Sequence, residues 1–157
     1  MRASLEWKDG MTFVATARTH TFTLDTASLG GKDLGPSPKE ALIAAVLGCS
    51  GIDVIAHLKK HRIGLRKFAL HGNAESRETH PRIFPQIDVV FDLEVDLPDP
   101  ESDLPKVIEA VELSMTKYCG VSAMVAPTSP IFYTVRVNGE IEGRGQADFP
   151  PEPASKS

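Results

Sequence analysis

Apolar and polar residues alternate over the first 25 positions, and this pattern predicts β-strands. The strands are expected at residues 3–7, 11–16 and 20–25, where the segments ASLEW, MTFVAT and HTFTLD change character from position to position. Lys8-Asp9-Gly10 lies between the first two segments, and an Asp-Gly pair is a strong hairpin signal. This region is therefore expected to form short antiparallel strands joined by turns.

A long apolar helix is predicted over residues 38–60. Ser37 can cap it, Pro38 suits the first helical position, and Glu40 completes an S-x-x-E capping box. Apolar residues recur along the segment: Leu42, Ile43, Val46, Leu47, Val54, Ile55 and Leu58. Because they leave almost no polar face before the lysines at its end, we expect this helix to be central and buried on most sides.

Strands follow near residues 67–75 and 87–95, the second with apolar residues at every other position. A second helix is predicted from apolar residues at helical spacing: Val107, Ile108, Val111, Met115 and Tyr118. It is expected to break near Cys119 and to restart before Pro127. The final strand is expected at residues 131–137, IFYTVRV.

This order of elements predicts an α+β architecture in which the helices lie against antiparallel sheet. We expect a single domain over residues 1–137. Residues 138–157 are rich in glycine, proline and glutamate and have few apolar side chains, so we expect a disordered C-terminal tail there.

The chain has 157 residues, about the size of one domain, and a formal net charge of −4 at pH 7. That charge gives no electrostatic argument for binding nucleic acid or an anionic membrane. No charged and apolar leader opens the sequence, and the longest apolar run, around residues 41–47, is far shorter than a membrane span. We therefore expect a cytoplasmic protein, in which two cysteines are more often reactive or metal-binding than a permanent disulfide.

The two cysteines, Cys49 and Cys119, are the first candidates for chemistry. Cys49 lies in the middle of the long helix, where burial favours the neutral thiol and core packing is the commoner role. If a short helix begins at Gly120, its free N–H groups and dipole would stabilise a Cys119 thiolate. Alternatively, Cys119 only fills space beside Tyr118. Taken one at a time, the residues leave these alternatives open.

A stripe of metal-ligand residue types occupies every fourth position of the long helix: Cys49, Asp53, His57 and His61. Each step of four residues turns by about 40° around the helix, so only neighbouring members converge. The sequence has neither an H-E-x-x-H nor a C-x-x-C pattern, and the histidines lie near the solvated, lysine-rich helix end. We therefore expect no metal site.

Two motifs in this order resemble the OsmC/Ohr family of thiol-dependent proteins that process hydroperoxides. The first is GPSPKEALIAAVLGCSGIDV, residues 35–54, which is similar to the family's first-cysteine helix. The second is KYCGVSAMV, residues 117–125, in which the cysteine is followed by x-V-S. The PSP segment and the aspartate four residues after the first cysteine resemble the YhfA-like branch. The resemblance extends over about residues 1–137.

The resemblance implies an α+β homodimer of intertwined subunits, with antiparallel sheets around two central helices and active sites at the subunit interface. It implies that Cys49 is peroxidatic and attacks the O–O bond of an organic hydroperoxide. Cys119 would then be resolving and would condense with the Cys49 sulfenic acid to a disulfide. An external dithiol reductant would restore the thiols, and no metal, haem or flavin cofactor would be needed.

The best-studied peroxidases of the family that this chain resembles activate the first cysteine with an arginine from an N-terminal strand or loop, held by a glutamate near the helix start. Arg18 is the candidate arginine. Glu40 is the candidate glutamate, and an ungapped alignment of the helix start puts Lys39 at that position. Asp53 follows Cys49 by one helical turn and, if ionised, would raise the pKa of the thiol. The alternative function is therefore a non-enzymatic protein that binds a small apolar or thiol-reactive ligand.

Overall fold

The computed structural model describes residues 1–150. It divides the chain into two compact units, one of residues 1–44 and the other from Ala45 onward. The division falls within the long helix, and each unit contains its own β-sheet.

A three-stranded antiparallel sheet forms most of the first unit, as the alternating pattern predicts. Its strands are, in spatial order, β1 (Ala3–Asp9), β2 (Thr12–Ala17) and β3 (His20–Leu24). The register pairs Leu5 with Ala15 and Trp7 with Phe13, so apolar side chains share one face. Within this unit that face is open, because Trp7 is 61% and Phe22 is 50% exposed.

The helix α1 (Pro38–Lys60) begins where the capping box predicts, after the short 3-10 helix η1 (Ala27–Leu29). The Ser37 N–H donates to Glu40 Oε2 at 2.7 Å, and the Glu40 N–H donates to Ser37 Oγ at 3.3 Å. The second of these bonds satisfies an N–H group that the first turn of a helix leaves without a helical partner.

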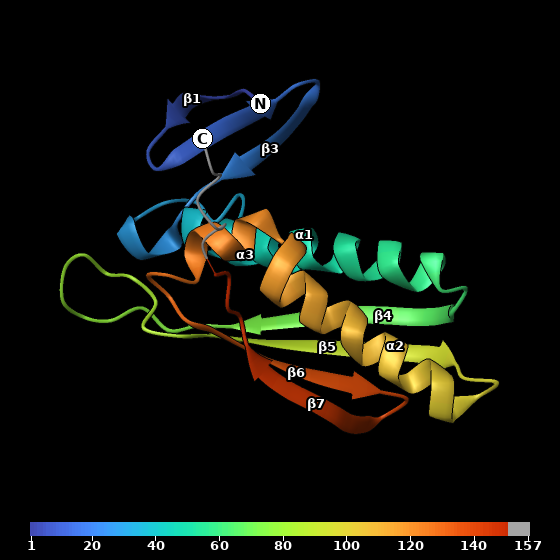
Figure 1. Ribbon diagram of the computed structural model, residues 1–157. Coiled ribbons are helices and arrows are strands. Elements are labelled where there is room, and N and C mark those ends of the chain that lie inside the picture. Colours follow the sequence, from blue (N-terminus) through green and yellow to red (C-terminus); the bar gives the residue numbers. More distant parts are fainter. Residues whose placement is uncertain (151–157) are drawn as a thin grey trace, which may run out of the picture. The chain divides into compact units, whose positions relative to one another are not determined.

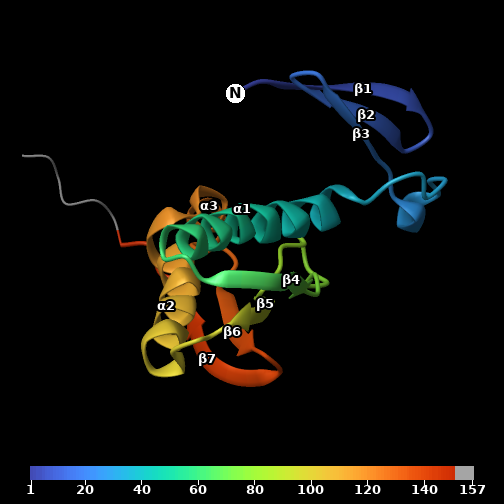
Figure 2. The same ribbon diagram turned by 90° about the vertical axis from the view of Figure 1, so that its right-hand side faces the viewer.

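The second unit is a four-stranded sheet with its helices on one face (Figures 1 and 2). After α1 its elements are β4 (Gly64–Asn73), β5 (Ile87–Asp96), α2 (Pro100–Leu113), the π-helical turn η2 (Ser114–Tyr118), α3 (Gly120–Val125), β6 (Ile131–Val137) and β7 (Glu140–Gln146). The strands lie in the order β4-β5-β6-β7. The pair β5–β6 is parallel and departs from the antiparallel expectation, because the crossover through α2 and α3 returns the chain in the same direction.

The sheet and the helices of this unit bury an apolar core between them. β5 alternates as its pattern predicts, with every odd-numbered residue from Ile87 to Val95 buried. The helices contribute the buried residues Val46, Val54, Leu58, Val107, Ala110 and Val111. At Gly51, where α1 approaches β4, an added Cβ would lie only 3.1 Å from Leu70 Cδ1, so glycine permits the close packing.

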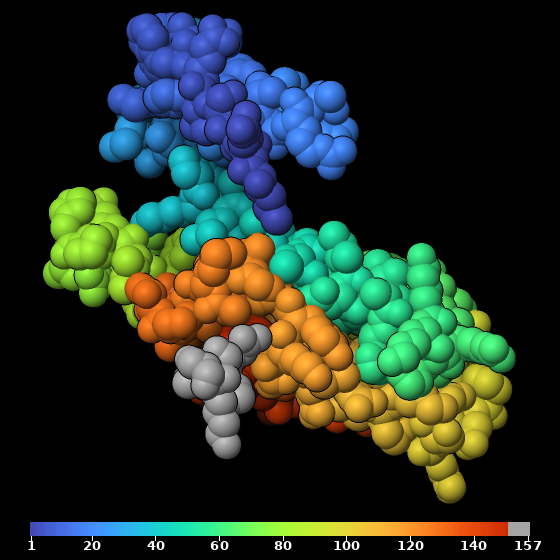
Figure 3. Space-filling view, turned by 45° about the horizontal axis from the view of Figure 1, so that its top comes forward, coloured from blue at the N-terminus to red at the C-terminus, as the bar shows by residue number. Residues whose placement is uncertain are grey.

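Only one face of α1 is buried within the described part of the chain. Ile52 is 70% exposed, and Gly48 and Ala56 are exposed on the same helix. Figure 3 shows α1 beside the segment that follows α2, on the face turned to the viewer. The expectation of burial on most sides is therefore wrong for the single chain. Judged by length and composition alone, α1 is long and apolar enough to cross a membrane. Core helices of water-soluble proteins meet the same criterion.

A hairpin closes the sheet where the sequence predicts a disordered tail. Asn138 and Gly139 have φ angles of 50° and 93°, as in the tight turns that favour an Asn-Gly pair, and β7 pairs with β6. The expectation of disorder from residue 138 is therefore wrong for residues 140–146. The Asn138-Gly139 pair is a sequence signal for a hairpin turn, but the few apolar residues of β7 gave no sign that a strand follows it. Residues 151–157 lie outside the described residues.

The turn predicts the effect of substitutions at Asn138, whose amide pairs with the backbone of Val95. The Val95 N–H donates to Asn138 Oδ1 at 2.9 Å, and Asn138 Nδ2 donates to the Val95 carbonyl at 3.2 Å. We expect Asn138→Ala to lower the free energy of unfolding by about 1–3 kcal/mol, because it removes both bonds and because alanine, unlike asparagine, has no polar side chain to favour a positive φ. Asn138→Gly removes the same bonds without the backbone strain and should be less destabilising by about 1 kcal/mol. Urea denaturation checks both values, and an alanine variant as stable as the wild type would contradict the account.

Candidate functional site

Three side chains of the second unit converge in what we call the cysteine cluster: Cys49, Asp53 and Cys119. The Sγ atoms of the two cysteines and a carboxylate oxygen of Asp53 all lie within 4.8 Å of one another. Cys49 and Asp53 lie one turn apart on the same face of α1, as their spacing predicts. Cys119 comes from the start of α3, so the fold joins two cysteines that are 70 residues apart in sequence.

The turn η2 and the helix α3 position Cys119 from both sides. The Cys119 N–H donates to the Ser114 carbonyl at 3.0 Å and closes the π-helical turn. α3 begins at Gly120, as predicted, and Cys119 is its N-terminal cap. Its Sγ accepts hydrogen bonds from the Ser122 N–H at 3.3 Å and from Ser122 Oγ at 3.0 Å. The sulfur is therefore fixed in direction by two donors of one residue.

Burial changes the pKa of Cys119 more than the two hydrogen bonds from Ser122 do. The side chain is fully buried, and burial raises its pKa to about 11, although both hydrogen bonds from Ser122 lower it. The neighbouring Cys49 raises the pKa further. The helix start alone therefore does not make Cys119 a thiolate at neutral pH. Cys49 is only half-buried.

Asp53 is held by a serine that connects α1 to η2. Ser114 Oγ lies 3.2 Å from Asp53 Oδ2 and 3.3 Å from the Ser50 carbonyl, so its hydroxyl can donate to either. Burial raises the pKa of the Asp53 carboxyl, and the Ser114 hydrogen bond opposes that change. The sequence interpretation missed Ser114. The available signal was a polar residue three positions after Val111, on the apolar face of a predicted helix.

A groove of about 400 Å³ adjoins the cysteine cluster, because Asp53 is one of its lining residues. The others are Ala56, His57, Lys60 and Tyr118. His57 Nε2 is buried without a hydrogen-bond partner among the described residues, and Glu109 Oε2 lies 3.7 Å away. Burial lowers the pKa of His57, so its imidazole is neutral at physiological pH.

The two histidines of the four-residue stripe form a separate pair. The rings of His57 and His61 stack with their centroids 4.5 Å apart. Cys49 and Asp53 belong instead to the cysteine cluster, which contains neither histidine. The structure therefore confirms that only neighbouring members of the stripe converge, Cys49 with Asp53 and His57 with His61. The first of these pairs is joined by Cys119, which lies outside the stripe.

Arg18 and Glu40 belong to the first unit, whereas the cysteine cluster is built from the second unit alone. Arg18 lies exposed in the turn between β2 and β3, with a φ angle of 60°. Glu40 lies exposed in the capping box, where hydrogen bonds from Ser37 lower the pKa of its carboxyl. The activating roles that the resemblance implies for these two residues stay predictions.

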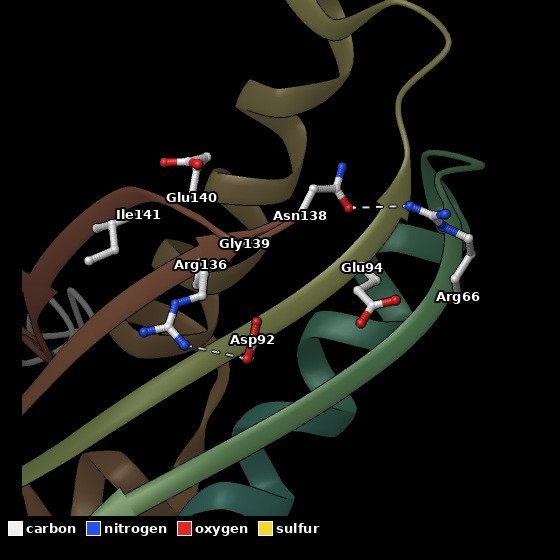
Figure 4. A pocket seen from close by; sticks show the side chains of 8 residues that line it. All are labelled: Arg66, Asp92, Glu94, Arg136, Asn138, Gly139, Glu140 and Ile141. Atoms are coloured by element: carbon white, nitrogen blue, oxygen red, sulfur yellow. Dashed lines mark hydrogen bonds and ion pairs between the residues drawn. The ribbon is translucent and has the colours of Figure 1, made fainter.

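A larger hollow, of about 840 Å³, lies over the strands β4, β5, β6 and β7 and their turn (Figure 4). It is lined by Arg66, Asp92, Glu94, Arg136, Asn138, Gly139, Glu140 and Ile141. Both of its arginines have partners there: Arg136 lies 3.5 Å from Asp92, and Arg66 donates to Asn138 at 3.5 Å. We interpret this hollow as a solvated sheet surface, and the cysteine cluster as the candidate site.

An α+β fold of this order with two adjoining cysteines is typical of one class of thiol proteins, and comparison with known proteins identifies the family. A family model described as OsmC-like protein matches residues 30–146. The protein YhfA of Escherichia coli K12 is 34% identical over 139 residues, which cover 87% of this chain and 98% of YhfA. The chain therefore belongs to the OsmC family.

Solved structures share the fold. A hypothetical protein from Aquifex aeolicus VF5 is 28% identical, with a TM-score of 0.74, over 88% of this chain and 96% of that one. An organic hydroperoxide resistance protein OsmC from Legionella pneumophila is 15% identical, with a TM-score of 0.56, over 87% of this chain and 94% of that one. At that identity the second likeness shows the fold alone.

The hydrogen bonds to Cys119 predict how Ser122 affects its ionisation. In a Cys49→Ser background, we expect Ser122→Ala to raise the pKa of Cys119 relative to its value in the Cys49→Ser parent, because one of the two donors to the thiolate is lost. At a given alkaline pH the thiolate fraction should fall about tenfold. Thiolate absorbance at 240 nm measures it, and Ser102→Ala, at an exposed serine of α2, is the control. An unchanged titration curve in the Ser122 variant would contradict the assignment.

Proposed function

We propose that the protein is a thiol peroxidase that reduces organic hydroperoxides with Cys49 and Cys119. The observation that carries this proposal is the separation of their Sγ atoms, which is within 4.8 Å across 70 residues of sequence. A disulfide requires the two sulfurs to approach to about 2.05 Å. Rotation of the two side chains toward each other is the movement that would join them. The family membership and the name of the Legionella relative agree with this chemistry.

In the first step, the Cys49 thiolate attacks the distal oxygen of the hydroperoxide. An S–O bond forms, the O–O bond breaks, and the alkoxide leaves and takes a proton to become an alcohol. In the second step, Cys119 loses its proton and attacks Sγ of the Cys49 sulfenic acid, forming the disulfide and releasing water. The two thiols thus supply the two electrons that reduce the peroxide, and an external dithiol restores them.

The difference in burial favours Cys49 as the residue that meets the peroxide. Cys49 is half-buried and therefore within reach of a substrate, whereas Cys119 is fully buried and its pKa is raised to about 11. A thiol that is inaccessible and protonated suits the resolving role, because it reacts only with a group already beside it. The proposal therefore assigns the peroxidatic role to Cys49 and the resolving role to Cys119.

The proposal includes a homodimer in the cytoplasm, where dithiol reductants are available. Two open apolar surfaces support a second copy as the partner: the face of the first sheet that carries Trp7, and the exposed face of α1 that carries Ile52. Contiguous exposed apolar surface of this kind is typical of a protein interface. The dimer would cover the side of α1 that the single chain leaves open.

The two cysteine variants separate the steps of the proposed reaction. With cumene hydroperoxide, we expect Cys49→Ser to lose activity by at least about 1,000-fold, because no other group replaces the nucleophile. Cys119→Ser should consume about one equivalent of peroxide and stop at the sulfenic acid, which dimedone traps and mass spectrometry detects.

The control for this test is Ser102→Ala, at an exposed serine of α2 that lies outside the cysteine cluster. It should still consume peroxide through a Cys49–Cys119 disulfide. The proposal fails if the Cys49→Ser protein consumes peroxide as fast as the wild type, or if both thiols of the wild type survive one equivalent of peroxide.

The dimer is tested at Ile52. We expect the wild-type protein to sediment as a dimer and Ile52→Glu to sediment as a monomer, because the new charge would be buried without a partner in the interface. The matched control is Ile141→Glu, at an exposed apolar residue of β7. Sedimentation of the wild type as a monomer at micromolar concentration would contradict the proposed assembly.

The groove beside Asp53 favours a second candidate function, the binding of a small ligand without turnover. Its lining combines the apolar surface of Ala56 and Tyr118 with polar groups at His57 and Lys60. Such a mixture of apolar walls and few polar groups is typical of small-molecule sites. In addition, the carboxylate of Asp53 disfavours a neighbouring thiolate. Ligand binding that persists in a variant with both cysteines changed to serine would favour this function over the peroxidase.

A further inference from the structure

The cysteine cluster contains a carboxylate that the peroxidase chemistry does not require. An ionised Asp53 beside two thiols opposes the formation of either thiolate. A cation placed between the three groups would reverse that effect, because it stabilises the two sulfurs and the carboxylate in their charged forms together. The arrangement therefore favours an occupant of positive charge.

We propose that Cys49, Asp53 and Cys119 form a zinc site. Thiolate and carboxylate oxygen are both established zinc ligands, and two soft sulfur ligands select zinc over magnesium or calcium. Three protein ligands would leave the fourth position of a tetrahedral ion to water. This inference goes beyond the proposed peroxidase, since it requires no reaction with peroxide.

The spacing of the three atoms suits a zinc ion. With Zn–S distances of about 2.3 Å and Zn–O distances of about 2.0–2.2 Å, the ligand atoms of a tetrahedral ion lie roughly 3.5–3.8 Å apart. The three atoms of the cluster already lie within 4.8 Å of one another. A contraction of about an ångström by side-chain rotation would complete the site. Because Asp53 also lines the groove, the cluster adjoins a hollow through which an ion can enter.

The proposed ligand atoms accept hydrogen bonds from neighbouring serines, as the ligands of metal sites commonly do. Ser122 donates to Cys119 Sγ through both its N–H and its hydroxyl, and Ser114 Oγ can donate to the Asp53 carboxylate. Such bonds orient ligands and stabilise them in their charged forms, and their loss typically lowers metal affinity 10- to 100-fold. Two of the three ligands are therefore already held in place. The helical stripe alone did not predict this site, because Cys119 lies outside it.

The test is a zinc titration of the reduced, metal-free protein in competition with a chromophoric chelator. We expect one zinc ion per chain. Cobalt(II) in place of zinc should give the sulfur-to-cobalt charge-transfer band near 350 nm that reports thiolate ligands. Cys49→Ser and Cys119→Ser should each weaken zinc binding by at least about 100-fold, and Asp53→Asn and Ser122→Ala by about 10- to 100-fold.

The control is Asp88→Asn, at an exposed carboxylate of β5, which should leave zinc affinity unchanged. Circular dichroism identifies any variant that fails to fold. Zinc affinity within threefold of the wild type in the Cys49→Ser protein would overturn the proposal. Cobalt binding without the sulfur band would overturn it as well, because the ion would then lie elsewhere, for example at His57 and His61. Absence of binding at micromolar zinc would also overturn it.

The zinc site and the peroxidase are tested separately. Peroxide consumption by the chelator-treated protein tests the peroxidase alone, and zinc affinity of the reduced protein tests the site alone. If both are correct, one equivalent of cumene hydroperoxide should release the bound zinc, because oxidation of the two thiolates to a disulfide removes two of its three ligands, while the peroxide is reduced to alcohol and water. Zinc binding without peroxide-driven release would retain the site and reject the peroxidase.

Discussion

The π-helical turn η2 is the element on which the cysteine cluster depends. Its first residue, Ser114, reaches across to Asp53 and the Ser50 carbonyl of α1. The Ser114 carbonyl also accepts the N–H of Cys119, which ends the turn and starts α3. A regular α-helix through these residues would direct Cys119 differently, and π-helical turns recur at functional sites for this reason. The turn therefore links the helix of the first cysteine to the segment of the second.

Burial shapes the chemistry of the cluster more than any charged group of the second unit does. It raises the pKa of Cys119 to about 11 and raises the pKa of Asp53, although both groups accept hydrogen bonds from serines. A fully buried thiol reacts with partners that the fold brings beside it, and here that partner is Cys49. Burial would also strengthen the attraction between a bound cation and the Cys119 thiolate, since that sulfur is shielded from water.

The sequence predicted the features that depend on local chemistry. The capping box of Ser37 and Glu40, the alternation of β5 and the restart of a helix at Gly120 all follow from residues close together in the chain, and the structure confirms them. Three predictions failed because they depended on distant partners. β7 is stabilised by pairing with β6 more than by its own composition, α1 is covered on one face only, and β6 pairs in parallel with β5.

The candidate site was predictable in its residue types but not in its geometry. The motifs identified Cys49 and Cys119, and helical spacing placed Asp53 one turn from Cys49. No local pattern could show that the three would meet, because that depends on the register of η2 against α1. Ser114 was missed because a serine has many roles in a helix, and only its position on the buried face singles it out.

Whether Cys49 and Cys119 react as a pair is tested by a peptide map of the protein, digested without reduction after brief oxidation by an organic hydroperoxide. We expect one cross-linked peptide that joins the segments of Cys49 and Cys119 and is absent from the untreated protein, while the oxidised protein migrates as a single chain on a denaturing gel without reductant. Recovery of both cysteines as unlinked peptides, or of links between chains alone, would contradict the claim that these two thiols act as a pair.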